Sequence, residues 1–321
     1  MILDHIDPSI FSPSTETCIC IGMFDGVHKG HQQLILKTVH NAKENRQPSV
    51  LVTFQNNPKI VHGESLSLTA NNEKLEIIKA LDIDYVINLP FPGTVAGLTP
   101  VDFVDQILIS GLHASNVFIG KNFRFGVKRS GNSDDLKYIG SERNIHVMVE
   151  HMINFEGKEI SSTYCRFLIH TRMFEHLRSM LGYPYFLTGS VIHGQGRGAK
   201  IGLPTINIKE SYPEKIKPSE GVFITKTIIR GKCYDSITLY GPVPSFNQCE
   251  KSLETLVLDF EDTVYEEKVT VLFYAFLRDI RKFNTSQELT DQIQIDTKST
   301  REYYKNNPEK LPVLLDFLKS Y

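Results

Sequence analysis

The segment that most constrains this chain covers residues 18–31 and reads CICIGMFDGVHKGH. Small and apolar residues at 18–21 predict a buried strand, and the helix-like run QQLILKTVHNA begins directly after His31. Between them the pattern is broken at Gly22, Asp25, Gly26 and Gly30. This order of strand, glycine-rich turn and helix predicts an anion-binding turn, because a helix N-terminus presents unpaired N–H groups and the positive end of the helix dipole.

Two histidines make this turn a candidate polyphosphate site. His28 and His31 are three residues apart, a spacing at which both rings can donate hydrogen bonds to one polyphosphate. Gly26 and Gly30 remove the Cβ atoms that would keep the backbone away from such a ligand. A surface turn with two solvated histidines is the alternative, and this segment alone leaves both interpretations open.

Strands and helices alternate through the first half of the chain. Further strands are predicted at SVLVTF (49–54), YVINLPF (85–91), NVFIG (116–120) and IHVMVE (145–150), and helices at 71–81, 99–111 and 133–140. Thr99 and Ser133 are the expected N-caps of the last two helices. The alternation predicts an α/β fold, a doubly wound parallel sheet with helices on both faces. Such sheets bind ligands at the carboxyl ends of their strands, where residues 22–31 lie.

The ten residues GMFDGVHKGH resemble the signature of the nucleotidyltransferases that carry an HxGH motif. The FDGV before that motif looks like the version found in the prokaryotic bifunctional riboflavin kinase/FMN adenylyltransferase (FAD synthetase) family. The resemblance implies that His28 and His31 act on the phosphates of ATP. It also implies that other residues of the turn bind nucleotide or flavin, namely Gly22, Phe24, Asp25, Gly26 and Gly30.

The segment GKNFRFGVKRSG (120–131) resembles the second motif of this family. The resemblance implies that Asn122, Phe123 and Phe125 help to hold the flavin and the nucleotide. Without the resemblance, a turn asparagine and two core phenylalanines would be the expectation.

The segment ISSTYCRFL (160–168) resembles the family motif ISSTRIR, whose hydroxyls and last arginine contact the phosphates of ATP. The matching residues are Ser162, Thr163 and Arg166. From the residues alone, the hydroxyls predict either a phosphate site at a helix N-terminus or an ordinary N-cap.

The second half of the chain changes to successive strands. A helical pattern ends at Leu181 and is stopped by Gly182 and Pro184, so we expect two domains, residues 1–181 and residues 182–321. Strands are predicted at FLTGSVIHG, GVFITKTIIRG, CYDSITLYG, LETLVLDF and KVTVLFYAFL. Five or six strands in succession predict a small antiparallel β-barrel. A capping-box pattern at Thr285 and Glu288 predicts a C-terminal helix packed on it.

This half resembles the riboflavin kinase module of the same family. The resemblance implies that Thr205 and Asn207 hold the Mg²⁺ of MgATP, a cation that prefers oxygen ligands. The first motif of this half is HGQGRGAKIGLPTIN (193–207), a glycine-rich loop whose N–H groups and positive charges suit phosphate binding. The nucleotide-binding residues expected in it are Gly196, Arg197, Lys200 and Pro204. Glu254 matches the general base that takes the proton of the riboflavin 5′-hydroxyl. From the residues alone, two alternatives stay open: residues 193–207 form a flexible surface loop, and Glu254 is a strand residue that faces solvent.

The chain departs from the family pattern in both halves. Tyr164 stands where relatives have an arginine, and Asn56 and Asn57 replace a proline and a histidine. The changes at Asn56 and Asn57 are expected to alter the kinetics or the substrate preference of the first half. Residues 237–248 match the kinase module only in outline, which makes the kinase activity the weaker expectation.

Composition argues against several other classes of protein. With 321 residues, 41% of them hydrophobic, the chain is long enough for two packed domains. A net charge of −2 gives no sign of a nucleic-acid or membrane partner, and no run approaches the ~18 apolar residues of a membrane span. The N-terminal residues lack the pattern of a signal peptide, so a cytoplasmic protein is expected. Five scattered cysteines without CxxC spacing predict reduced thiols.

The expected function is a two-step synthesis of FAD from small-molecule substrates. Riboflavin and ATP would give FMN in the second module, and FMN and ATP would give FAD and pyrophosphate in the first. His28, His31, Arg166 and Mg²⁺ are expected to supply positive potential for the phosphates. One alternative is a monofunctional FMN adenylyltransferase with an inactive kinase-like domain, and another is a flavin-sensing protein without turnover. Weak self-association is left open.

Overall fold

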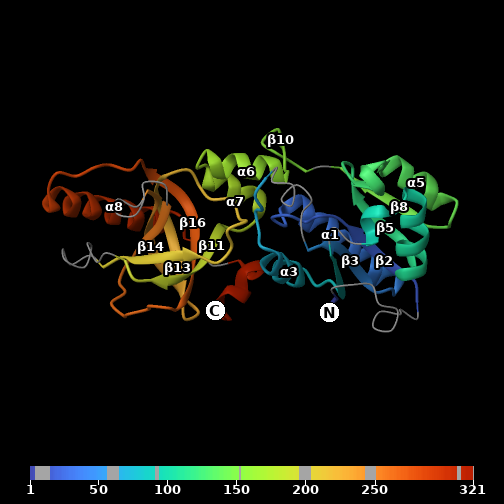
Figure 1. The fold of residues 1–321 in the computed structure, drawn as a ribbon, viewed down its shortest axis with the longest axis horizontal. Helices are drawn as coiled ribbons and strands as arrows, with labels where there is room; N and C mark the ends of the chain where they lie inside the picture. The colour runs from blue at the N-terminus through green and yellow to red at the C-terminus, as the bar shows by residue number, and fades with distance from the viewer. Residues whose placement is uncertain are drawn as a thin grey trace. The chain divides into compact units, whose positions relative to one another are not determined.

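The computed structural model divides the chain into two compact units, Met1–Ser162 and Thr163–Tyr321 (Figure 1). The residues described are 1–3, 15–55, 65–90, 94–151, 153–194, 204–242, 251–308 and 312–320.

A parallel sheet of six strands forms the centre of the first unit, hydrogen-bonded in the order β1-β4-β3-β2-β5-β8. The strands are β1 (Ile2–Leu3), β2 (Thr17–Ile21), β3 (Ser49–Phe54), β4 (Tyr85–Leu89), β5 (Ala114–Gly120) and β8 (His146–Glu150). All of β2 and nearly all of β3 are buried, as expected for a sheet covered on both faces. The doubly wound sheet predicted from the sequence is confirmed, and β1 is an additional edge strand.

Helices cover both faces of this sheet. They are α1 (Lys29–Asn45), α3 (Asn71–Lys79), α4 (Pro100–Asp102), its continuation as the π-helix η2 (Phe103–Gly111), and α5 (Ser133–Ser141). On one face, the Cys18 thiol donates to Oδ1 of Asn41 in α1 at 3.4 Å. On the other, Ile19 belongs to a core cluster with Phe103 and Leu108 of η2. Residues that alternate along a strand therefore pack against different helices.

Shorter elements complete the first unit. They are η1 (Thr94–Gly97), β6 (Arg124–Phe125), η3 (Val127–Arg129), β7 (Gly131–Asn132), β9 (Asn154–Phe155) and β10 (Lys158–Glu159). Thr99 is the N-cap of α4, as predicted, and its hydroxyl accepts from the N–H of Asp102 at 3.1 Å. The expected cap at Ser133 is wrong, because Asn132 caps α5 and accepts from the N–H of Asp134 at 2.7 Å.

A closed antiparallel barrel forms the second unit, with the strand order β11-β12-β15-β14-β13-β16. Its strands are β11 (Tyr185–Ile192), β12 (Ile206–Glu210), β13 (Gly221–Ile229), β14 (Lys232–Pro242), β15 (Lys251–Val257) and β16 (Lys268–Arg278). Buried hydroxyls link three adjacent strands, since Thr238 Oγ1 lies 2.8 Å from Thr225 Oγ1 and 2.9 Å from Thr255 Oγ1. The predicted barrel is confirmed.

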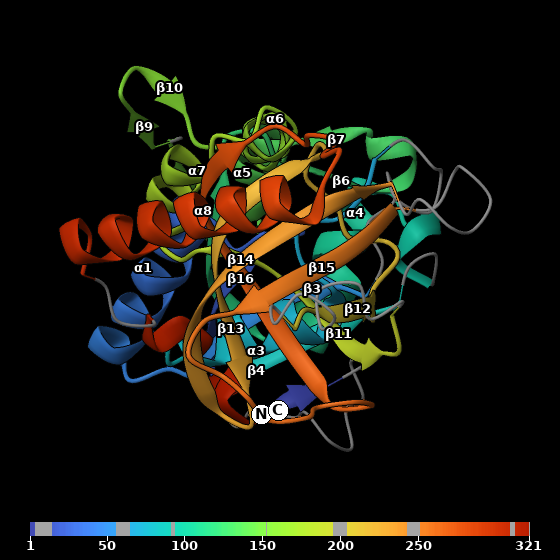
Figure 2. The ribbon, with the colours of Figure 1, turned by 90° about the vertical axis from the view of Figure 1, so that its left-hand side faces the viewer.

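The remaining helices are α6 (Ser162–His170), α7 (Phe174–Leu181), α8 (Ser286–Asn306) and the 3₁₀-helix η5 (Val313–Ser320). α8 begins at its predicted cap, where the Thr285 hydroxyl accepts from the N–H of Glu288 at 3.1 Å. It lies across the outside of the barrel over β14 (Figure 2), and Asp296 of α8 accepts from the guanidinium of Arg278 at 2.8 Å. The predicted C-terminal helix is confirmed.

Helix α7 packs on the barrel. The ring of Phe174 stacks on Phe273 with 5.2 Å between centroids and meets Phe223 edge-on at 5.5 Å. Gly182 ends α7 with a φ of 81°. The boundary between the two compact units therefore lies before α7, whereas the strand-rich part of the sequence begins after α7. The predicted division into functional domains after residue 181 stays a prediction.

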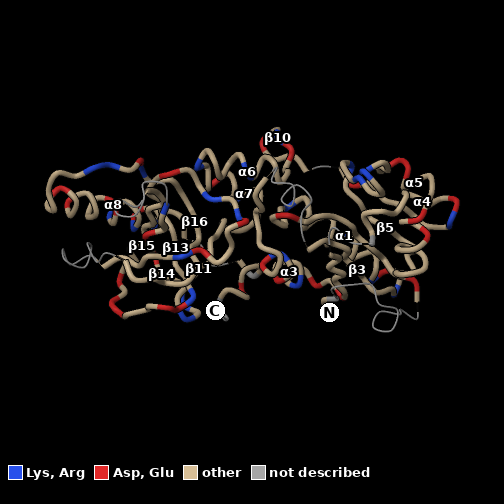
Figure 3. The backbone as a smooth tube through the Cα atoms, viewed as in Figure 1, with Lys and Arg blue, Asp and Glu red and all other residues tan. Residues whose placement is uncertain are grey.

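Acidic and basic residues are interspersed along both units (Figure 3). Among the residues that the structure describes, none of the helices combines the length and the apolar character that a bilayer crossing requires.

Candidate functional site

The glycine turn, residues 22–31, lies at the carboxyl edge of the parallel sheet where the strand order reverses. The chain runs from β2 to β3 and β4 on one side, and then to β5 and β8 on the other. Gly22 follows β2, Gln55 follows β3 and Lys121 follows β5, so three loops open at the same edge. Ligands of doubly wound sheets bind at this reversal of strand order.

Part of the glycine turn has a left-handed backbone conformation. Phe24 and Gly26 have φ values of 50° and 77°. A Cβ at Gly26 would lie 2.6 Å from Cδ1 of Leu68, so glycine is required there for packing as well as for φ. The buried carboxylate of Asp25 accepts from the N–H of Leu68 at 2.9 Å and of Thr69 at 3.4 Å. These contacts give Asp25 and Gly26 a structural role, and ligand contacts by them stay a prediction.

His28 is the N-cap of α1. Its Nδ1 accepts from the N–H of His31 at 3.3 Å, and the residue is only 4% exposed. Because Nδ1 is an acceptor, the neutral ring carries its proton on Nε2, which is the donor left for a ligand. Gly30 makes room for this ring, since a Cβ there would lie 3.2 Å from Nδ1 of His28.

His31 stacks on His28 with 3.6 Å between ring centroids, and Phe24 meets it edge-on at 5.3 Å. Nδ1 of His31 is buried and has no hydrogen-bond partner among the described residues. A buried polar atom without a partner is unfavourable, so we expect a ligand or water atom at this nitrogen. The structure thus brings together the two histidines that the sequence singled out.

The electrostatics of the pair differ from the expectation that the histidines supply positive potential. Burial lowers the pKa of His28 to about 4. Burial also lowers the pKa of His31 well below 6.5, and the neighbouring His28 and Lys74 lower it further. Both imidazoles are therefore neutral at pH 7, and they offer N–H donors rather than charges.

Lys74 of α3 is a residue of this site that the sequence analysis missed. It is 5% exposed, and its Nζ donates to the carbonyl of Phe54 at 2.7 Å and to Oγ1 of Thr53 at 3.2 Å. A signal was present, because the helical spacing that buries Ile77 and Ile78 places Lys74 on the same face.

The loop after β5 carries the second predicted motif. Phe125 is buried in the sheet core with its ring 5.4 Å from Phe103, and half-buried Phe123 stacks on Phe125 at 5.6 Å. Asn122 is exposed in the turn. Phe125 therefore has the packing role that the sequence left as the alternative, and flavin contacts by these three residues stay a prediction.

The third predicted motif begins at the glycine turn. The hydroxyl of Ser162 donates to the carbonyl of Asp25 at 2.9 Å. Thr163 is exposed and Arg166 half-buried in the first two turns of α6, which belong to the second unit. Phosphate contacts by Thr163 and Arg166 stay a prediction.

The kinase residues meet on two neighbouring strands of the barrel. The sheet register pairs Asn207 of β12 with Glu254 of β15, so the amide and the carboxylate project from the same face. Gly194 lies against this amide, because a Cβ there would come within 2.0 Å of Nδ2 of Asn207. Half-buried Thr205 and exposed Pro204 come directly before β12. The predicted metal ligands and the predicted base are therefore neighbours.

Other predicted positions fall outside the described residues. They are Asn56, Asn57, Gly196, Arg197 and Lys200. Of residues 237–248, only those up to 242 are described.

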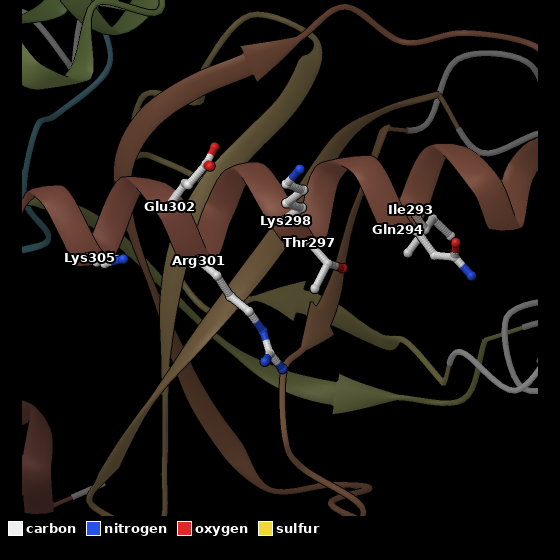
Figure 4. A pocket seen from close by; sticks show the side chains of 7 residues that line it. All are labelled: Ile293, Gln294, Thr297, Lys298, Arg301, Glu302 and Lys305. Carbon is white, nitrogen blue, oxygen red and sulfur yellow. The ribbon is translucent and has the colours of Figure 1, made fainter.

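A groove runs along α8 of the second unit. It is lined by Ile293, Gln294, Thr297, Lys298, Arg301, Glu302 and Lys305 (Figure 4). Nη2 of Arg301 donates to Oδ1 of Asp259 at 2.7 Å. The groove contains none of the predicted site residues.

Comparisons with known proteins match both halves of the chain. A family model for FAD synthetase matches residues 11–164, and one for riboflavin kinase matches residues 181–304. A bifunctional riboflavin kinase/FMN adenylyltransferase from Buchnera aphidicola is 33% identical over 91% of this chain and 95% of its own length. Its counterpart from Bacillus subtilis is 31% identical over 95% of this chain and 98% of its own length.

A solved structure matches nearly the whole fold. A crystal structure described as a macrolide-efflux protein from Streptococcus pneumoniae has a TM-score of 0.83 and 27% sequence identity. The match covers 94% of this chain and 98% of that one. Two family models in succession and relatives that match over nearly their full length show that the chain belongs to the bifunctional riboflavin kinase/FMN adenylyltransferase family.

Proposed function

We propose that the chain phosphorylates riboflavin to FMN in its second unit and adenylylates FMN to FAD in its first. The observation that carries the adenylylation is the stacked pair of His28 and His31 at the N-terminus of α1, with Nδ1 of His31 lacking a partner among the described residues. The register pair of Asn207 and Glu254 supports the kinase step. Matches to both family models favour this proposal over a monofunctional enzyme or a flavin sensor.

Adenylylation needs no nucleophile from the protein. The phosphate of FMN is ionised at neutral pH, since its second pKa is about 6. An oxygen of this phosphate attacks the α-phosphorus of ATP, a new P–O bond forms, and the bond to the β-phosphate oxygen breaks as pyrophosphate leaves. The chain contributes position and hydrogen bonds. Nε2–H of His28 and backbone N–H groups at the start of α1 are the donors that we assign to the phosphates.

In the kinase step, Glu254 takes the proton of the riboflavin 5′-hydroxyl. The hydroxyl oxygen then attacks the γ-phosphorus of ATP, and ADP leaves. Thr205, Asn207 and Glu254 offer hydroxyl, amide and carboxylate oxygens, a set that suits Mg²⁺. We assign Thr205 and Asn207 to the Mg²⁺ of MgATP, which neutralises phosphate charge when it is bound.

Product analysis tests the proposal. Purified protein is incubated with ATP and Mg²⁺, once with riboflavin and once with FMN, and the flavins are separated by chromatography. We expect FMN and then FAD from riboflavin, and FAD from FMN. FAD from FMN without any FMN from riboflavin would indicate the monofunctional enzyme, and flavin binding without product would indicate the sensor. A cytoplasmic location and weak self-association are further proposals, tested by cell fractionation and light scattering.

A further inference from the structure

Lys74 is a buried cation that the mechanism above does not use. Its Nζ donates to Oγ1 of Thr53 at 3.2 Å, and this hydroxyl donates in turn to the carbonyl of Met23 at 3.3 Å. A second bond at 2.7 Å runs from Nζ to the carbonyl of Phe54, the last residue of β3. One ammonium group therefore connects α3, the carboxyl end of β3 and the glycine turn.

The charged neighbours of Lys74 belong to the glycine turn and to its own helix. Asp25 of the turn acts to raise the pKa of Lys74, but burial outweighs it and lowers that pKa to about 8. The positive charge of the Lys74 ammonium lowers the pKa of His31. On α3, the buried carboxylate of Glu73 accepts from the N–H of Ala70 at 2.9 Å. β3 offers Lys74 only uncharged oxygens, from Thr53 and Phe54.

The ammonium of Lys74 supplies a positive charge that the neutral histidines do not supply. Two neutral imidazoles can donate hydrogen bonds to a triphosphate but cannot offset its negative charge. A cation held in a water-poor site interacts more strongly with charge than it would in water. The bonds to Phe54 and Thr53 also fix its position before substrate arrives, so little reorganisation is needed at the moment of reaction.

We propose that Lys74 is a positioning residue for adenylyl transfer, whose ammonium anchors the end of β3 to the glycine turn and supplies fixed positive charge near His31. The inference rests on the proposed adenylylation. It assigns no direct contact between Lys74 and substrate. Loss of the proton from Lys74 at alkaline pH would weaken both the anchor and the charge, so the adenylylation rate follows the charge state of this residue.

The test is the pH profile of kcat/KM for ATP in FAD formation, measured from pH 6.5 to 10 on the full chain. This parameter reports groups of the free enzyme. Phosphate groups of the substrates are fully ionised above pH 7, since their second pKa is about 6. For the wild type we expect a decline above pH 8 that approaches about tenfold per pH unit. Riboflavin phosphorylation by the same samples is the control for folding of the second unit, and urea unfolding followed by far-UV circular dichroism is the control for the whole chain.

Three variants separate the outcomes. Lys74→Arg keeps the charge and should lose the decline between pH 8 and 10. Lys74→Met should give a flat profile, with kcat/KM at pH 7 reduced by about 10- to 100-fold, less than the ~10²–10³ of a donor in direct contact. The matched control is Lys79→Met on the same helix, which removes an exposed lysine paired with Glu76 at 2.6 Å and should keep the wild-type profile.

Two results would overturn the inference. One is an alkaline decline that persists unchanged in Lys74→Met, and the other is an equal loss of both activities in that variant, which would assign Lys74 to folding alone. If the wild type forms no FAD from FMN at any pH, the proposed function itself fails, and this failure is distinguishable from the other two.

Discussion

Substitution of His28 separates its role in the helix from its role in the site. The side chain caps α1 through Nδ1 and the N–H of His31, and it keeps Nε2–H for a phosphate. His28→Ala removes both functions. His28→Asn restores a good N-cap acceptor but removes the imidazole donor.

The expected magnitudes differ for the two functions. Loss of an N-cap costs about 1 kcal/mol, in a range of roughly 0.5–2 kcal/mol. Loss of one preorganised donor to a transition state lowers kcat by about 10²–10³, or ~2.7–4 kcal/mol. The asparagine variant should therefore be about 1 kcal/mol more stable than the alanine variant. Both should be equally poor in FAD formation.

The assay combines activity with unfolding. FAD formation from FMN and ATP is measured beside riboflavin phosphorylation, which should keep its wild-type rate in both variants. Unfolding in urea is followed by far-UV circular dichroism, because the chain has no tryptophan. Restoration of FAD formation by asparagine would show that His28 acts only as a helix cap and donates no hydrogen bond to a phosphate. A parallel loss of the kinase activity would indicate misfolding.

Three further predictions address pH and the kinase site. Folding lowers the pKa of His28 from 6.5 to about 4, so the unfolded chain binds more protons than the folded chain between these pH values. The free energy of unfolding should therefore drop by roughly 2 kcal/mol from pH 7 to pH 5 because of His28. Urea titrations at both pH values check this, and an unchanged drop in His28→Asn would contradict it. Glu254→Gln should slow riboflavin phosphorylation by about 10²–10⁴ without affecting FAD formation from FMN, and a normal kinase rate would exclude Glu254 as the base. Gly194→Ala should raise KM for MgATP in the kinase step, because its Cβ would fall 2.0 Å from Nδ2 of Asn207; an unaltered KM would show that this amide does not bind the nucleotide.

Most of the fold follows from periodicity in the sequence. Apolar runs such as residues 49–54 predict the parallel sheet, and the successive strands of the second half predict the barrel. The strand β1 was missed because two residues carry no periodic signal. The wrong prediction of a cap at Ser133 has a local cause. Asn132 is an equally good capping residue one position earlier, and its side-chain oxygen accepts from the first N–H groups of α5.

The site was predicted in part, and the remainder depends on burial. The spacing of His28 and His31 located the turn, but only the packed structure shows that burial leaves both rings neutral at pH 7 by lowering the pKa of each. Motif membership could not distinguish Phe125, which is buried in the core, from Asn122, which is exposed. The sequence did not indicate Lys74 because lysine side chains are mostly exposed, so a lysine among apolar residues of a helix is expected to face solvent.

Binding of the ATP phosphates at the stacked histidines can be observed in a crystal structure of the chain with a non-hydrolysable ATP analogue. We expect a phosphate oxygen within about 3 Å of Nε2 of His28 or Nδ1 of His31. Phosphates bound away from the glycine turn, with Nδ1 of His31 hydrogen-bonded to a protein atom instead, would contradict it.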